Sequence, residues 1–111
     1  MQISSQNQPQ QDSPFFSILI LCWNSNAYIH TCLESLNSQT FKDFEVLFVD
    51  NGSPEPVPSE ELQRYPDLAL RYFRLEKNIG FAAGNNYAAT HARGQYLVLL
   101  NSDAFPQPDW L

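Results

Sequence analysis

Four short apolar runs, each of strand length, constrain the fold of this chain more than any other feature. The first two, residues 15–23 (FFSILILCW) and 44–49 (FEVLFV), lack a strict alternation of polar and apolar residues. Runs of this kind are typical of strands that are buried on both faces of a parallel sheet. Residues 70–75 (LRYFRL) and 96–100 (YLVLL) are predicted to form two further strands. The less apolar run 70–75 is expected nearer an edge of the sheet.

Helical segments are predicted between these strands. Apolar residues recur at helical spacing in residues 26–39, and a short helix capped by Ser59 is predicted around residues 59–65. A third helix is predicted over residues 80–93, with Gly94 as its C-terminal cap. One face of this helix carries Phe81, Gly84, Ala88 and Ala92. The alternation of strand and helix predicts an α/β fold with a mostly parallel sheet and flanking helices.

Length and charge limit the classes to which the chain can belong. It has 111 residues, 43% of them hydrophobic, which suits one domain with a packed core. Residues 1–14, rich in Gln, Ser and Asn, are expected to be a disordered lead, so that residues 15–111 form the ordered domain. Six basic residues against twelve acidic ones give a net charge of −6, which argues against binding to nucleic acid or to an anionic membrane surface.

The sequence predicts neither a membrane-spanning nor a secreted protein. No apolar stretch approaches the roughly 20 residues that cross a bilayer. The start of the chain has neither the basic segment nor the apolar run of a secretory signal. Cys22 and Cys32 do not form a disulfide framework, and nothing near them has the spacing of a zinc site. These features predict a reduced, cytoplasmic setting.

Two of the four predicted strands end in acidic residues. Asp50 follows the second apolar run, and Asn101-Ser102-Asp103 follows the fourth. The carboxyl ends of parallel strands meet at one edge of a sheet, where α/β proteins bind their ligands. Asp50 also suits the start of the turn at residues 51–54, so a purely structural role for it stays open.

The turn after the first strand excludes a dinucleotide-binding domain. Residues 21–26 (LCWNSN) contain no glycine, although that class requires a glycine-rich turn there, and the chain has no Walker-type phosphate loop. The remaining arrangement offers Trp23 for stacking on a base and Asp50 to accept the N–H of a pyrimidine imide. Asp103 offers a ligand for a divalent cation that would neutralise a diphosphate. This order of residues describes a site for a nucleotide-diphosphate sugar.

The sequence resembles family 2 glycosyltransferases, which have the GT-A fold, over residues 15–111. The stretch FSILILCWNSNAYIHTCLESLNSQTFKDFEVLFVDNGS is similar to the opening of that family. The segment NIGFAAGNNYAATHARGQYLVLLNSDAFPQPDWL is similar to its continuation in the rhamnosyltransferase-like subgroup. The resemblance implies a Rossmann-like α/β architecture, of which this chain is the N-terminal, donor-binding part in truncated form.

The resemblance also implies a set of donor-site residues. Asp50 matches the base-binding carboxylate of the family, and Asp103 matches the last acid of its D-x-D motif, a metal ligand near the diphosphate. Asn101 replaces the first acid of that motif, so affinity for Mg²⁺ or Mn²⁺ is expected to depend mainly on Asp103. The full set implied to bind the nucleotide sugar is Cys22, Trp23, Asn24, Asp50, Asn51, Asn78, Gly80, Asn85, Asn101 and Asp103.

The activity that the resemblance implies is inverting transfer of a sugar from a UDP- or dTDP-linked donor. The acceptor is a glycan or a lipid-linked molecule, and the place is the cytoplasm or the inner face of the membrane. The catalytic base is expected beyond Leu111. The alternative interpretation is a donor-binding half without transferase activity, which associates with itself or with a partner. A nucleotidyltransferase fits less well, because the glycine-rich, basic start of that class is absent.

Overall fold

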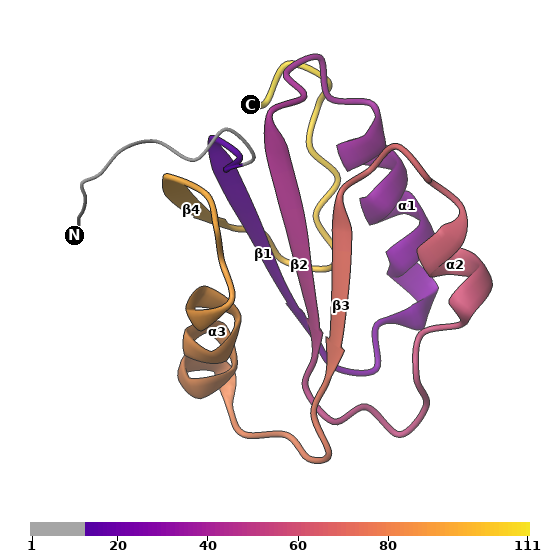
Figure 1. Cartoon of the computed structure of the whole chain (residues 1–111). Helices are drawn as coiled ribbons and strands as arrows, with labels where there is room; N and C mark the ends of the chain where they lie inside the picture. Colours follow the sequence, from indigo (N-terminus) through magenta and orange to yellow (C-terminus); the bar gives the residue numbers. More distant parts are fainter. Residues whose placement is uncertain (1–12) are drawn as a thin grey trace.

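The computed structural model describes residues 13–111, which form a four-stranded sheet with helices on both faces (Figure 1). Residues 1–12 of the expected disordered lead lie outside this range. The elements, in chain order, are β1 (Phe16–Cys22), α1 (Asn26–Asn37), β2 (Phe44–Asp50), α2 (Ser59–Gln63), β3 (Leu70–Arg74), α3 (Phe81–Thr90) and β4 (Tyr96–Leu99). The predicted alternation of strand and helix is confirmed.

The strand order in the sheet is β3-β2-β1-β4, and all three strand pairs are parallel. The strands β1 and β2 lie at the centre, and every residue of β2 is buried, which is why these runs are apolar without alternation. The strand β3 lies at one edge, as its lower apolar content predicted. The strand β4 forms the other edge, where Leu97 and Leu99 are 48% and 56% exposed despite the apolar character of the run.

A hydrophobic layer on each face of the sheet holds the helices in place. On one face, the side chains that pack together are Ile29, Cys32, Leu33 and Leu36 of α1 with Ile18, Ile20, Val46 and Phe48 of the sheet. On the other face, Ala88 of α3 packs with Leu19, Leu47 and Val49. Figure 1 shows α1 and α2 on one side of the sheet and α3 on the other. Successive residues of each central strand therefore face α1 and α3 in turn.

Gly84 allows α3 to lie close to the sheet. A Cβ at this position would lie 2.7 Å from a methyl carbon of Leu21, so any side chain there would force Leu21 to move. Gly84 and Ala88 are the buried residues of α3, as the predicted face requires. Phe81, predicted on the same face, is 70% exposed instead, because it is the first residue of the helix and lies beyond the sheet edge.

Two of the predicted helix caps are wrong. Gly94 does not cap α3, because the helix ends earlier and His91 occupies the capping position. Gly94 instead lies against β1, where its N–H donates to Ser17 Oγ at 2.8 Å and a Cβ would lie 2.6 Å from the same oxygen. Ser59 is the first residue of α2, and Pro58 occupies the capping position before it.

The last segment of the chain returns from β4 towards the opposite end of the sheet (Figure 1). The side chain of Gln39, which is fully buried after α1, donates from Nε2 to the C=O of Gln107 at 2.7 Å. Its Oε1 accepts the backbone N–H of Leu111 at 3.1 Å. The N–H of Thr40 donates to the C=O of Pro108 at 2.9 Å. Asn101 and Asp103 lie at the start of this segment, and these bonds hold its other end against the residues that follow α1.

Candidate functional site

The loop after β2 connects the segments that meet at the carboxyl edge of the sheet. Its first four residues, Asp50 to Ser53, contact three different neighbours. Asp50 contacts β3, and Ser53 contacts the turn after β1. Asn51 and Gly52 contact the turn before α3. This tetrapeptide therefore determines the geometry of the whole edge.

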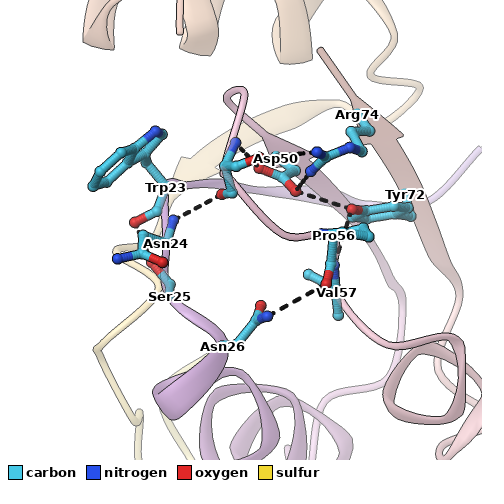
Figure 2. Close-up of polar contacts among 10 residues, drawn as sticks. Trp23, Asn24, Ser25, Asn26, Asp50, Pro56, Val57, Tyr72 and Arg74 are labelled. Atoms are coloured by element: carbon cyan, nitrogen blue, oxygen red, sulfur yellow. Dashed lines mark hydrogen bonds and ion pairs between the residues drawn. The ribbon is translucent and has the colours of Figure 1, made fainter. Parts of the chain in front are cut away.

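The carboxylate of Asp50 is fully buried and accepts three hydrogen bonds. The N–H of Ser53 donates to Oδ1 at 2.9 Å, while Tyr72 Oη and Arg74 Nη1 donate to Oδ2 at 3.0 and 2.7 Å (Figure 2). Burial alone would raise the pKa of Asp50, but the hydrogen bonds from Ser53, Tyr72 and Arg74 outweigh it and hold that pKa below its ordinary value. Asp50 is therefore ionised and held in one orientation.

Tyr72 and Arg74 are site residues that the sequence analysis missed. The parallel register of β2 and β3 places Tyr72 beside Phe48 and Arg74 beside Asp50, so both side chains project on the α1 face. Their spacing of two residues, on a strand next to one that ends in an acid, was the available signal. Arg74 Nη2 also donates to the C=O of Ser53 at 2.9 Å, so the arginine holds both the carboxylate and the loop.

Asn51 fixes the turn before α3. Its Oδ1 accepts the N–H of Ile79 at 3.0 Å, and its Nδ2 donates to the C=O of Gly80 at 3.1 Å. Gly52 follows with a φ of +76°, and a Cβ there would lie 2.6 Å from the Cα of Lys77. Only glycine suits both the backbone angle and this close approach.

Ser53 fixes the turn after β1. Its Oγ accepts the N–H of Asn24 at 2.7 Å. Asn24 has a φ of +55°, a left-handed conformation that few residues other than glycine adopt. Such held conformations cluster at ligand-binding sites. Trp23, immediately before it, is 49% exposed, so the fixed turn presents an indole ring at the edge of the sheet (Figure 2).

A hollow of about 210 Å³ lies beside these turns. The residues that line it are Leu21, Cys22, Trp23, Asn51, Asn78 and Phe81. Leu21 and Phe81 also line a smaller hollow, together with Asn85 and Asn101 among others. Six of the ten predicted site residues therefore line two adjoining hollows at the carboxyl edge. Phe81 joins the two hollows and was not predicted to take part in the site.

The other predicted residues surround these hollows. Asp50 is not part of their lining, because its carboxylate is enclosed by β3 and its own loop. Asn24 and Gly80 belong to the two fixed turns at the rim. Cys22 lies on the floor, and its thiol is neutral, because burial and the nearby charge of Asp50 raise its pKa far above the ordinary range.

Asp103 is exposed, in the segment that follows β4. Ser102 Oγ donates to Ser25 Oγ at 3.0 Å, which places this segment beside the turn after β1. Burial, with a smaller contribution from the charge of Asp103, raises the pKa of the Cys32 thiol to about 11. The carboxylate of Asp103 is therefore close enough to α1 for its charge to affect the Cys32 thiol.

The predicted metal ligand is a single carboxylate. Within residues 13–111, no three His, Cys, Asp or Glu side chains come together as a metal site. Asn101, near Asp103, supplies an amide rather than a second charge. Magnesium ions are commonly held by one or two carboxylates together with phosphate oxygens of a substrate. These residues therefore fit a cation that is shared with a diphosphate, rather than one held by the protein alone.

Comparison with known proteins identifies the family. A model of glycosyl transferase family 2 matches residues 17–111. Chondroitin synthase of Escherichia coli is 35% identical over 96 residues, which are 86% of this chain and 14% of that protein. The crystal structure of S. aureus TarS 1–349 in complex with UDP has a TM-score of 0.78 and 31% identity, covering 86% of this chain and 29% of that one. The mannosyltransferase PcManGT of Pyrobaculum calidifontis has a TM-score of 0.78 and 26% identity, covering 91% and 33%.

The parallel sheet with its flanking helices is that of the GT-A glycosyltransferases. The chain belongs to glycosyl transferase family 2. It spans 14% of the length of chondroitin synthase and 35% of the length of another curated relative, an uncharacterized glycosyltransferase of Methanocaldococcus jannaschii. In the part of the chain that the structure describes, no helix is long and apolar enough to cross a membrane. Membership of the rhamnosyltransferase-like subgroup stays a prediction.

Proposed function

We propose that this chain is the donor-binding part of a glycosyltransferase that uses a nucleotide-diphosphate sugar. The observation that carries the proposal is the convergence of Trp23, Asn51 and Asn78 on one hollow, in a chain of this family. The TarS structures contain UDP or UDP-GlcNAc, and the PcManGT structure contains GDP-Man and Mn²⁺. A uridine or thymidine diphosphate is the donor that we propose, because the imide of these bases suits the acceptor oxygens of Asp50.

In this proposal the base stacks on Trp23, and the buried Asp50 accepts its imide N–H. Arg74, whose side chain is 35% exposed, covers Asp50 from outside and must release its bond to Oδ2. The base N–H then takes the place of the arginine N–H, so that Oδ2 again accepts two hydrogen bonds once the base is bound. Residues of the two hollows and their rim contact the rest of the donor: Cys22, Asn24, Asn51, Asn78, Gly80, Asn85 and Asn101.

Asp103 would hold Mg²⁺ or Mn²⁺ together with oxygens of the donor diphosphate. When bound, the cation neutralises charge on the diphosphate. Because the protein offers one carboxylate, we expect the chain to bind the cation weakly without a nucleotide. Asn101 lines the smaller hollow, and its neutral amide would contact the donor by hydrogen bonding rather than through the cation.

The proposed reaction is sugar transfer with inversion to a glycan or a lipid-linked acceptor. The acceptor oxygen attacks the anomeric carbon, the bond from that carbon to the diphosphate breaks, and the hydroxyl proton passes to a general base. The chain spans about a third or less of the relatives compared above, and we propose that this base and the acceptor site belong to a part of the enzyme outside residues 1–111. The cytoplasm, or the inner face of the membrane, is the proposed place of the reaction.

The alternative is a donor-binding half that has no transferase activity and associates with itself or with a partner. Two observations favour it: the single carboxylate at the metal position, and the exposed apolar side chains of β4. Sugar transfer by the purified chain alone would contradict this alternative.

Calorimetric titration tests the donor site. UDP and dTDP are expected to bind in the presence of Mn²⁺ or Mg²⁺. Asp103→Asn is expected to weaken this binding about tenfold, since one charge-assisted ligand is lost. Asp109→Asn, an exposed acid on the same segment, is the matched control and should change nothing. If no nucleotide produces heat while circular dichroism shows an intact fold, the proposal is wrong.

A further inference from the structure

The exposed ring of Phe81 is a feature that the proposed contacts leave unexplained. Phe81 is the first residue of α3, and it is 70% exposed, the most of any large hydrophobic side chain in residues 13–111. Burying this ring against the sheet would stabilise the fold, so its exposure leaves the fold less stable than it could be. The ring lines both hollows at the carboxyl edge. The exposed ring of Phe81 therefore lies at the candidate site and not on an unrelated surface.

The turn that carries Phe81 is held by polar side chains from the same hollow. Asn51 bonds the N–H of Ile79 and the C=O of Gly80, at 3.0 and 3.1 Å. Asn78 Oδ1 accepts the N–H of Gly80 at 2.8 Å. Three hydrogen bonds thus fix the backbone immediately before the ring. A surface residue without a role would not need a backbone held in this way.

Trp23 reaches the same hollow from a second fixed turn. Ser53 Oγ holds the N–H of Asn24, directly after the indole. The two exposed rings therefore depend on one short loop, in which Asn51 fixes one turn and Ser53 fixes the other. The backbone positions of these two residues are therefore set before a ligand binds, which reduces the entropy cost of binding.

We infer that Phe81 is a second aromatic contact for the base of the donor nucleotide, in addition to Trp23. A planar base has two π faces, and aromatic side chains stack on them with little dependence on base identity. Asn78 lies in the same lining, where its side-chain Nδ2 donates to the polar edge of the ligand. The inference rests on the proposed donor site and extends it, because it adds a residue to that site.

The test compares UDP with 5,6-dihydro-UDP, whose base is neither aromatic nor planar while its ribose and diphosphate are unchanged. Binding of both ligands, with Mn²⁺, is measured by calorimetry on the whole chain and on Phe81→Leu. Phe81→Leu is expected to weaken UDP binding roughly five- to tenfold and dihydro-UDP binding less than about twofold. Phe81→Tyr, which keeps the ring, should restore UDP affinity to within about twofold.

Tyr96→Leu is the matched control. Tyr96 is 56% exposed and pairs with Phe16 at the other end of the sheet, so its loss should leave both affinities unchanged. Unchanged UDP affinity in Phe81→Leu would overturn the inference, and so would an equal loss for the two ligands, which would place the ring against the ribose. Failure of the unaltered chain to bind either ligand would instead remove the donor site itself.

Discussion

Gly52 shows how little freedom a single residue has in the loop after β2. Its φ of +76° lies in the left-handed region, and its Cα faces the backbone of residues 77 and 78. Its neighbours in the loop have equally restricted roles, because Asp50 is enclosed and Asn51 uses both ends of its amide. Substitutions here are therefore expected to change the shape of the site together with the stability of the fold.

Gly52→Ala is expected to lower the free energy of unfolding by about 2–5 kcal/mol, which combines left-handed strain with overpacking. Gly80→Ala is the matched control. Gly80 has a φ of +92° and a ψ of 169°, a backbone conformation almost confined to glycine, but a Cβ there would meet no other atom within 4 Å, so about 1–3 kcal/mol of strain is expected alone. Urea unfolding followed by circular dichroism measures both. Equal losses would show that the close approach to Lys77 contributes nothing.

The ion pair of Asp50 with Arg74 predicts how stability depends on pH. The pKa of Asp50 is lower in the folded chain than its ordinary value near 4, so the folded state is favoured above that value. This stabilisation is lost as the pH falls through the lowered pKa. Arg74→Met removes the counter-ion and raises the pKa of Asp50, so the midpoint of acid unfolding should move to higher pH. A pH titration of the far-UV signal measures the midpoint, and an unchanged value would contradict the prediction.

At the scale of elements, a second buried carboxylate joins the sheet to the segment after α3. Glu45 of β2 accepts Ser17 Oγ at 2.6 Å from β1 and Arg71 Nη2 at 2.9 Å from β3. It also accepts the N–H of Arg93 at 2.7 Å. Burial opposes these contacts, yet together they hold the pKa of Glu45 below its ordinary value. One side chain thus links three strands to the connection that leads into β4.

Arg71→Met is expected to cost about 2–3 kcal/mol of unfolding free energy, because it leaves the buried Glu45 without its counter-ion. The value lies at the low end for buried pairs, since the Arg71 side chain is 27% exposed. Arg64→Met is the control. Arg64 pairs with Glu61 on the surface with its side chain 51% exposed, so less than about 1 kcal/mol should be lost. Chemical denaturation of the two variants distinguishes them, and equal costs would contradict the role given to Glu45.

The strands were predictable from the sequence because burial on both faces leaves a continuous apolar signature. The runs ending at Cys22 and Asp50 show this signature, and both form central strands. The cap predicted at Gly94 failed for a different reason. That glycine is required by its contact with Ser17 of β1, and nothing near it in the sequence encodes that contact.

The position of a candidate residue was predictable where it ends or follows a strand. Asp50 ends β2 and Asn51 follows it, so strand prediction was enough to place both at the carboxyl edge. The contact of Arg74 with Asp50 depends on the pairing of β3 with β2, and the sequence alone does not specify that pairing. Phe81 was assigned to a helix face by periodicity, and only the structure shows that it lies beyond the edge of the sheet and is exposed.

At the scale of the whole molecule, the outer edge of β4 is an open edge of the sheet that carries exposed apolar side chains. Among residues 13–111, β4 pairs with β1 alone, so its other edge carries free backbone groups. Tyr96, Leu97 and Leu99 are each 48–56% exposed along the same strand. Exposed apolar edge strands favour pairing with another chain.

We expect the purified chain to associate with itself in a concentration-dependent way through β4. Leu97→Lys should shift the population towards monomer, because a charge at an exposed edge opposes strand pairing. Tyr28→Lys is the control, since Tyr28 is 50% exposed on α1, away from this edge. Sedimentation equilibrium over a range of concentrations measures the effect. A monomer at every concentration, for the unaltered chain, would rule the prediction out.

The strand order limits how early during synthesis the sheet can form. The first strand, β1, lies between β2 and β4, and Phe16 is in register with Tyr96. During synthesis the N-terminal part leaves the ribosome first, so one side of β1 lacks its partner until β4 emerges. Parallel pairings between distant segments also form slowly. The nascent chain must therefore keep one edge of its apolar first strand from wrong partners until residues 96–99 have been made and can pair with it.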